Sequence, residues 1–255
     1  MPKKNHSCFK TDYSKFYDLF YQGKDYAKEV KYIDSILKKY KSKIIRDVAC
    51  GTGNHLIELI KLGYKVDGSD ISSDMIEILK HKTRDLNLKC KTEVCSMTDI
   101  KSSVKYDAAL CMFAAINYLS GWREIDKFFK TLNKILKPGA LLIFDFWNGL
   151  LVPENHNKRG KKTVVSDNMK ITRETYTVVD KLNQNCAVHY NVSVMSGKKI
   201  VNKFNETHNL HYFSPEEIEI LLVNNNFNIL SIQPFGKNKK ISSNDWELVI
   251  TAQKK

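Results

Sequence analysis

From residue 44 to residue 148, short continuous apolar runs are followed in turn by segments with helical hydrophobic spacing. The continuous runs are typical of strands buried in a parallel sheet, and the helical spacing is typical of amphipathic helices packed on one. The pattern predicts a doubly wound α/β sheet, with a ligand at the carboxyl ends of its strands. The predicted strands begin at Ile44 and at 64, 90, 106 and 140, and the predicted helices cover 54–63, 72–86 and 121–137.

From residue 163 onwards, apolar and polar positions alternate, so the hydrophobic period changes to two residues. Segments 163–180, 185–197 and 198–213 alternate in polarity and are separated by the turns "KLNQN" and "SGKK", which predicts an antiparallel meander. A helix follows at 214–227, with Ser214 as N-cap and Glu217 completing a capping box, and then two strands at 228–235 and 246–253. We therefore expect an α/β core in 1–150, a β insertion in 151–213 and completion of a seven-stranded, mostly parallel sheet by 214–255. The runs "KRGKK" and "GKNKKISSN" are predicted to be solvated loops.

Composition narrows the class of protein. The chain has 255 residues and no apolar run of about 18 residues, so no membrane span is expected. Six cysteines without CxxC spacing, and no HExxH motif, favour a reduced cytoplasmic protein without a metal site. The net charge of +13 invites nucleic acid as a partner, but the lysines are spread along the chain and fit a general compositional bias equally well. Whether the chain forms a homodimer is left open.

The most informative motif is the turn "DVACGTGNH" between the first strand and the first helix, which Asn54 is expected to cap. A P-loop is excluded because its GxxxxGK[ST] pattern is absent. The dinucleotide pattern GxGxxG is incomplete, because Leu56 stands where its third glycine would be. Asp70, at the end of the second strand, can accept hydrogen bonds from both hydroxyls of a ribose. The alternative for the two glycines is a tight turn that binds no ligand, and the alternative for Asp70 is a helix cap. If the unit does bind a ligand, these residues suit an adenosine without phosphates.

The segments "DVACGTGNHL" and "VDGSDISSDMIEIL" resemble the class I S-adenosylmethionine-dependent methyltransferases. The resemblance implies a Rossmann-like fold. It also implies that Gly51 and Gly53 let the backbone approach the methionine part of the cofactor and that Asp70 binds its ribose. The full set of cofactor-binding residues predicted on this basis is Tyr26, Ala49, Gly51, Gly53, Asp70, Ile71, Met75, Ser96, Met97, Thr98, Cys111 and Met112.

A narrower resemblance rests on "TDYSKFYDLFYQGKDYAKEV", "CMFAAINYL", "FDFWNG" and "ETHNLHYF". These segments are similar to those of enzymes that N-methylate nucleotide-linked amino sugars, in which an aromatic N-terminal segment forms a lid. The resemblance implies a dTDP- or UDP-linked amino sugar as the small-molecule substrate. Some members carry His where Tyr118 stands, and the Pro-Glu pair that follows the fifth strand comes later here; both departures concern the identity of the sugar.

The acceptor site is predicted from the same resemblance. Tyr13, Tyr118 and His208 are the candidate catalytic residues, and the candidate substrate-binding residues are Tyr17, Trp147, Glu206 and Arg173. Aromatic packing of an N-terminal helix, a solvated Glu-x-His pair and a solvated basic segment are the alternative interpretations. RNA methylation, methylation of another small-molecule amine or hydroxyl, and a non-catalytic cofactor-binding module are the competing functions. The segment "CMFAAINY" lacks the Pro-Pro run of base-amino methylases, which disfavours a nucleobase amine.

Overall fold

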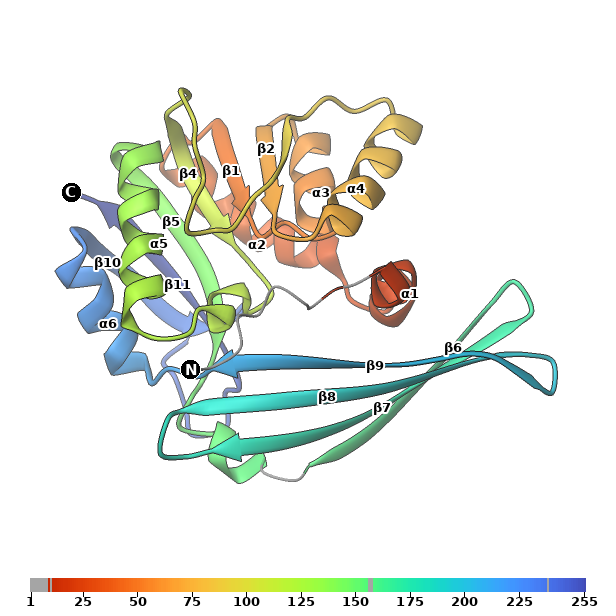
Figure 1. The fold of residues 1–255 in the computed structure, drawn as a ribbon. Helices are drawn as coiled ribbons and strands as arrows, with labels where there is room; N and C mark the ends of the chain where they lie inside the picture. The colour runs from red at the N-terminus through yellow and green to blue at the C-terminus, as the bar shows by residue number, and fades with distance from the viewer. Residues whose placement is uncertain (1–8, 10, 156–157, 238) are drawn as a thin grey trace.

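The computed structural model describes residue 9 and residues 11–155, 158–237 and 239–255. Its main element is a seven-stranded sheet in the order β10-β11-β5-β4-β1-β2-β3 (Figure 1). Strands β1 to β5 run parallel, and β11 runs antiparallel to both β5 and β10. The strands are β1 (Ile44–Val48), β2 (Lys65–Asp70), β3 (Thr92–Val94), β4 (Tyr106–Cys111), β5 (Leu136–Trp147), β10 (Phe227–Pro234) and β11 (Glu247–Lys254). The predicted doubly wound, mostly parallel sheet is confirmed.

Helices cover both faces of this sheet (Figure 1). One apolar core lies under α2 (Tyr26–Lys39), α3 (Asn54–Lys61) and α4 (Ser73–Asp85). The other lies under α5 (Trp122–Ile135), α6 (Pro215–Asn224) and the short helix η1 (Ala115–Tyr118). The capping box predicted at Ser214 and Glu217 is present at the start of α6. No helix within the described residues is long and apolar enough to span a membrane.

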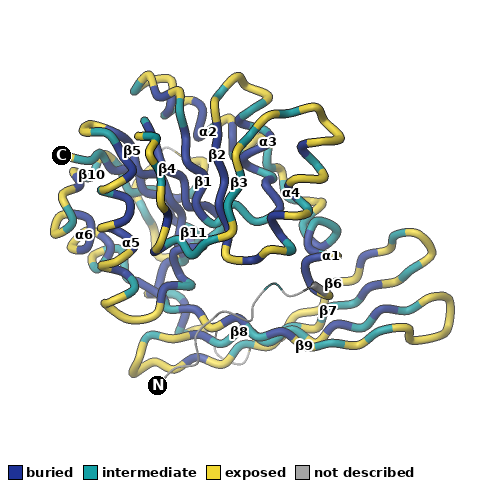
Figure 2. The backbone as a smooth tube through the Cα atoms, turned by 45° about the horizontal axis from the view of Figure 1, so that its top comes forward, coloured by how far each residue is buried: buried dark blue, intermediate teal, exposed yellow. Residues whose placement is uncertain are grey.

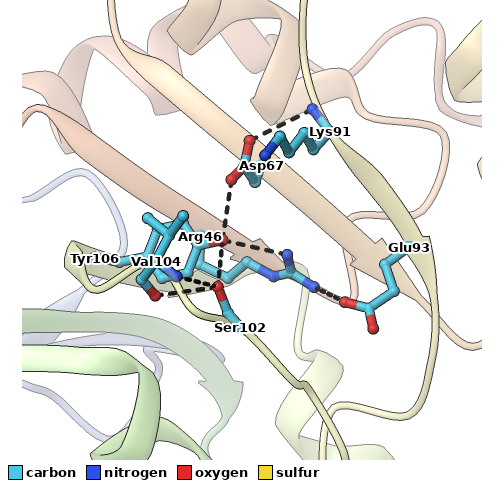
Figure 3. Close-up of polar contacts among 7 residues, drawn as sticks. All are labelled: Arg46, Asp67, Lys91, Glu93, Ser102, Val104 and Tyr106. Carbon is cyan, nitrogen blue, oxygen red and sulfur yellow. Dashed lines mark hydrogen bonds and ion pairs between the residues drawn. The ribbon is translucent and has the colours of Figure 1, made fainter.

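A buried polar network joins four neighbouring strands of the sheet (Figure 3). Arg46 on β1 is 4% exposed and donates to the Glu93 carboxylate on β3 at 2.8 Å. Its other terminal nitrogen lies 3.5 Å from the hydroxyl of Tyr106 on β4, which in turn donates to Asp67 on β2 at 3.0 Å. Because a buried charge without partners is costly, these bonds favour the native order of the strands.

The predicted insertion forms a separate antiparallel sheet in the order β6-β7-β8-β9, which follows β5 and a short helix, η2 (Val152–Asn155). Its strands are β6 (Arg159–Ser166), β7 (Met169–Asp180), β8 (Asn185–Ser196) and β9 (Lys199–His211). They extend beyond the α/β core (Figure 1), and buried positions alternate with exposed ones along them (Figure 2). Helix α1 (Thr11–Tyr21) packs its aromatic side chains on the buried face of this sheet.

The insertion has one strand more than the sequence pattern predicted. All of the run "KRGKK" except Lys158 belongs to β6 and is not a loop, and a tight turn at Asp167 and Asn168 separates β6 from β7. Both turn residues have positive φ, 48° and 64°. Asp and Asn tolerate this conformation, but without a glycine the turn gives little signal in the sequence. The described residues of the other predicted loop, 236–244, form no helix or strand; residue 238, like residues 1–8 and 10, lies outside the described part.

Two local predictions in the α/β core were wrong. Asn54 does not cap α3: the N-cap is Gly53, and the Asn54 amide donates to Asp18 on α1 at 3.0 Å. Strand β5 begins at Leu136 and not after the Pro138–Gly139 pair. Its register against β4 shifts between Leu136 and Leu141, so the proline lies where the ladder is interrupted and its missing N–H breaks no regular pair.

Candidate functional site

A cavity of about 390 Å³ lies at the carboxyl ends of β1, β2 and β4, enclosed by α1 and the insertion. Of the residues predicted for a site, those lining it are Tyr13, Tyr17, Tyr26, Ala49, Gly51, Asp70, Ile71, Met75, Ser96, Met97, Thr98, Met112, Tyr118, Trp147 and His208. Four others, Gly53, Cys111, Glu206 and Arg173, lie outside the cavity wall. The fold therefore gathers predicted residues from the α/β core and from the insertion around one space.

The two glycines of the first turn have different surroundings. Gly51 has a φ of 54°, and no atom lies within 4 Å of the position that a Cβ would occupy, which leaves an open cradle at the cavity. Gly53 has a φ of 79°, and a Cβ there would come within 2.2 Å of Leu79 on α4. Gly53 therefore permits close packing of α3 on α4, and its predicted backbone contact with the cofactor stays a prediction.

Asp70 fixes the geometry of this turn. One carboxylate oxygen accepts the Gly51 amide at 2.9 Å, and the other accepts the Ser72 amide at 2.8 Å. Burial raises the pKa of Asp70, and the backbone hydrogen bonds act against this rise. Each carboxylate oxygen can accept more than one hydrogen bond, so both remain able to accept from a ligand.

Asp47 on β1 is a cavity residue that sequence reasoning missed. It is 1% exposed, and its Oδ2 atom has no hydrogen-bond partner among the described residues. Burial, and then the neighbouring Asp70, raises its pKa to about 7. Its signal in the sequence was an isolated acid inside the apolar run "IIRDVAC". A buried carboxylate without a partner at a cavity wall is a place for a cationic or hydrogen-bond-donating group of a ligand.

The residues at this end fit the predicted cofactor, S-adenosylmethionine. Gly51 leaves room for a ligand close to the backbone, Asp70 offers acceptors for ribose hydroxyls, and Asp47 offers an acceptor for a positively charged amino group. Ser96, Met97 and Thr98 form the wall beyond the end of β3, where the adenine is expected. No lysine or arginine stands where a pyrophosphate would need one in the turn, in agreement with the missing P-loop lysine.

At the opposite end, three of the predicted acceptor residues form a chain. The Tyr118 hydroxyl lies 2.7 Å from Nδ1 of His208, and Nε2 of His208 lies 3.3 Å from the Glu206 carboxylate. His208 is 2% exposed, and Glu206, 7% exposed, also accepts the backbone amide of Phe9. The Glu-x-His pair is therefore not a solvated surface pair. Glu206 does not line the cavity itself, but it contacts two residues that do, His208 and Phe9.

Tyr13 lines the cavity, and Arg173 binds it from outside the cavity wall. The Tyr13 hydroxyl accepts from Nη1 of Arg173 at 2.6 Å, and the same nitrogen lies 3.2 Å from the Tyr21 hydroxyl. The guanidinium carbon also lies 4.5 Å from the centre of the Tyr190 ring. Arg173 thus holds α1 against the insertion, and it does not reach the cavity as an anion-binding residue. Burial raises the pKa of Tyr13 well above its usual value, so this phenol stays neutral.

Trp147 lines the cavity together with two residues that the sequence analysis did not single out, Trp246 and Glu247. The indole rings of the two tryptophans lie 5.4 Å apart. In the antiparallel pairing of β5 with β11, Glu247 is the register partner of Trp147. This pairing joins residues a hundred positions apart, so the sequence offered little to connect them.

Comparison with known proteins gives a consistent result. Residues 45–139 match the family described as "Methyltransferase domain". The chain is 28% identical to the dTDP-3-amino-3,6-dideoxy-alpha-D-glucopyranose N,N-dimethyltransferase of Streptomyces fradiae over 218 residues, which cover 82% of each protein. The predictions of a methyltransferase and of S-adenosylmethionine as its cofactor are confirmed.

Solved structures share the fold. An S-adenosylmethionine-dependent methyltransferase from Clostridium acetobutylicum superposes with a TM-score of 0.82 at 21% identity, over 95% of this chain and 98% of that one. CalS10, an amino pentose methyltransferase from Micromonospora echinaspora solved with S-adenosylmethionine, superposes with a TM-score of 0.75 at 18% identity, over 97% and 98%. The insertion is part of the shared architecture, since both matches cover nearly the whole chain.

We predict that Asp70→Asn weakens the binding of S-adenosylmethionine by on the order of 10- to 100-fold. The amide nitrogen of Asn must face either the Gly51 or the Ser72 N–H, so the turn loses one acceptor and opens. Titration calorimetry measures the affinity, with Asp85→Asn, an exposed substitution at the end of α4, as the control. Wild-type affinity in Asp70→Asn would contradict this role.

Asp47 should make the stability of the ligand-free protein depend on pH. Its pKa is about 7 when folded, against an ordinary value of 3.8. Between these values the unfolded chain loses the proton first, so ionisation of Asp47 lowers the free energy of unfolding as pH rises towards 7. Asp47→Asn removes this pH-dependent loss of stability. The free energy of unfolding of the variant minus that of the wild type should therefore be about 2 kcal/mol larger at pH 8 than at pH 5. Urea unfolding at both pH values tests this; an equal difference at both would refute it.

Proposed function

Because the chain is an S-adenosylmethionine-dependent methyltransferase, we propose that it transfers the methyl group to the amino group of a nucleotide-linked amino deoxysugar. The observation that carries this proposal is the shape of the site. An aromatic α1 and the β insertion close one cavity, which has acids for the cofactor at one end and the Tyr118–His208 pair at the other. The relative from Streptomyces fradiae, named for a dTDP-linked amino sugar, matches across both the core and the insertion.

The chemical demands on the protein are modest. When bound, S-adenosylmethionine supplies a methyl carbon that is already electrophilic because it is attached to a sulfonium sulfur. The acceptor amine needs a free lone pair and an in-line approach, which a pre-formed cavity provides by proximity and orientation. The aromatic side chains of α1, among them the buried Tyr13 and Tyr17, exclude water from this approach.

Tyr118 can accept a hydrogen bond from the amine, and His208 can receive the proton that the amine loses. When His208 carries its proton on Nε2, which lies 3.3 Å from the Glu206 carboxylate, Nδ1 accepts from the Tyr118 hydroxyl, and the Tyr118 oxygen can in turn accept an N–H from the amine. If the amine passes its proton to the Tyr118 oxygen, the hydroxyl proton moves to Nδ1. The resulting imidazolium lies beside the Glu206 carboxylate, which stabilises its charge.

Of the two candidate tyrosines, this arrangement favours Tyr118 for the proton transfer. The Tyr13 hydroxyl accepts from the Arg173 guanidinium, whereas Nδ1 of His208 is bonded to Tyr118. We therefore assign Tyr13 to the wall of the site, together with Tyr17. Arg173 keeps both of them in place through α1.

The proposed substrate is tested with a panel. The purified protein is incubated with S-adenosylmethionine and dTDP- or UDP-linked sugars that carry an amine at position 3 or position 4. Mass spectrometry should show a gain of one or two methyl groups on at least one amino sugar and none on RNA. The proposal fails if no amino sugar gains mass while RNA or an unrelated small amine is methylated.

Tyr118→Phe should lower kcat by on the order of 100-fold, because it removes the oxygen that accepts the amine N–H and leads to His208. Affinity for S-adenosylmethionine should stay within about twofold, since Tyr118 lies at the acceptor end. Tyr176→Phe, on the outer face of the insertion, is the matched control. A kcat like that of the wild type in Tyr118→Phe would exclude the proton route described above.

A further inference from the structure

Building on the proposed function, we propose that Glu247, supported by Asp145, binds the acceptor's amino group in its cationic form and thereby selects amines over hydroxyls. The two acids stand on neighbouring antiparallel strands, Asp145 on β5 and Glu247 at the start of β11. Glu247 lines the cavity, and Asp145 lies behind it, fully buried. The selecting group is thus a carboxylate at the cavity wall, and its charge distinguishes an ammonium from a hydroxyl.

The strand register puts these residues on one face of the sheet. Glu247 pairs with Trp147, and Val249 pairs with Asp145. Because alternate residues of a strand point to the same face and register partners share a face, Asp145, Trp147 and Glu247 project in the same direction. Asp145 and Glu247 are diagonal neighbours, and Glu247 is close enough to raise the pKa of Asp145.

The acid pair has no cationic partner of its own. Asp145 Oδ2 accepts the Ala114 amide at 2.9 Å, and its Oδ1 atom has no donor among the described residues. No described lysine, arginine or histidine lies within ion-pair distance of either carboxyl group. Lys24 acts to lower the pKa of Asp145 through its charge, but its ammonium group is paired with Glu29.

Asp145 is expected to hold a proton in this acid pair. Burial, and then the neighbouring Glu247, raises the pKa of Asp145 well above its usual value. A protonated Asp145 can donate from Oδ1, the oxygen that lacks a donor, towards Glu247. The pair then presents one carboxylate to the cavity, held in position from behind, as two acids that share a proton do.

The surrounding rings add to the selection for a cation. Trp147 and Trp246, 5.4 Å apart, both line the cavity next to Glu247. Tyr118, which binds the amine in the proposed reaction, packs on the same small apolar cluster as these two tryptophans. It therefore lies at the same end of the cavity. Indole faces attract ammonium groups, whereas they give a neutral hydroxyl no comparable gain. An ammonium that docks here is within reach of the Tyr118–His208 chain, which takes its proton before transfer.

The test compares ligands in matched pairs. The protein is saturated with S-adenosylhomocysteine, which cannot donate a methyl group, and titrated by calorimetry with a dTDP-linked 3-amino sugar and its 3-hydroxy counterpart. The same two sugars without the nucleotide form a second pair. The variants are Glu247→Gln, which keeps the shape and removes the charge, and Glu247→Asp, which keeps the charge. Glu219→Gln on the exposed face of α6 is the control for the loss of an acid elsewhere.

The wild type and Glu219→Gln should prefer the amine by about tenfold or more, as expected for a charge-assisted hydrogen bond. Glu247→Gln should reduce this preference to within about twofold, and Glu247→Asp should keep most of it. The inference is overturned if Glu247→Gln retains the preference, or if the wild type shows none in either pair. A different result would count against the proposed substrate: the protein prefers the amine in both pairs but binds the nucleotide-linked sugars no more tightly than the sugars without a nucleotide.

Discussion

The site depends on one kind of interaction, used twice: a carboxylate at the end of one strand accepts the backbone amide of the turn that follows its neighbour. Asp70, which ends β2, accepts the Gly51 amide in the turn after β1. Asp145, near the end of β5, accepts the Ala114 amide in the turn after β4. In a parallel sheet all these ends meet at one edge. The two turns therefore lie side by side and form the floor of the cavity.

Both turns hold residues in a conformation that needs such support. Gly51 has positive φ, as do Phe113 and Ala114, which are not glycines and carry a Cβ penalty there. The backbone N–H of a residue with positive φ cannot join the regular hydrogen bonds between strands. A buried N–H without a partner is costly. The acids supply that partner. Their own desolvation is partly offset by the bonds they accept, which leaves buried carboxyls with raised pKa values beside the cavity.

The second half of the site depends on how α1 is held over the edge of the sheet. Arg173 is placed among the hydroxyls of Tyr13 and Tyr21 and the faces of the Phe20 and Tyr190 rings. A guanidinium is planar and weakly hydrated, so it tolerates such aromatic surroundings better than an ammonium. It joins a helix near the start of the chain to a strand more than 150 residues later. The same insertion supplies His208, so the arrangement that closes the cavity also brings in the group that we propose as the proton acceptor.

The sequence by itself determined the alternation of strands and helices, the β insertion, the capping box of α6 and the glycine turn with Asp70. These follow from local periodicity and from residues close in the chain, where hydrophobic spacing and backbone conformation suffice. Tertiary structure decided the rest. Gly53 packs against Leu79, Arg173 and Glu206 lie behind the cavity wall, and Asp47, Trp246 and Glu247 line it. Strand register and helix packing set which side chains face a shared space. Those contacts join residues far apart in the chain, and no local pattern encodes them.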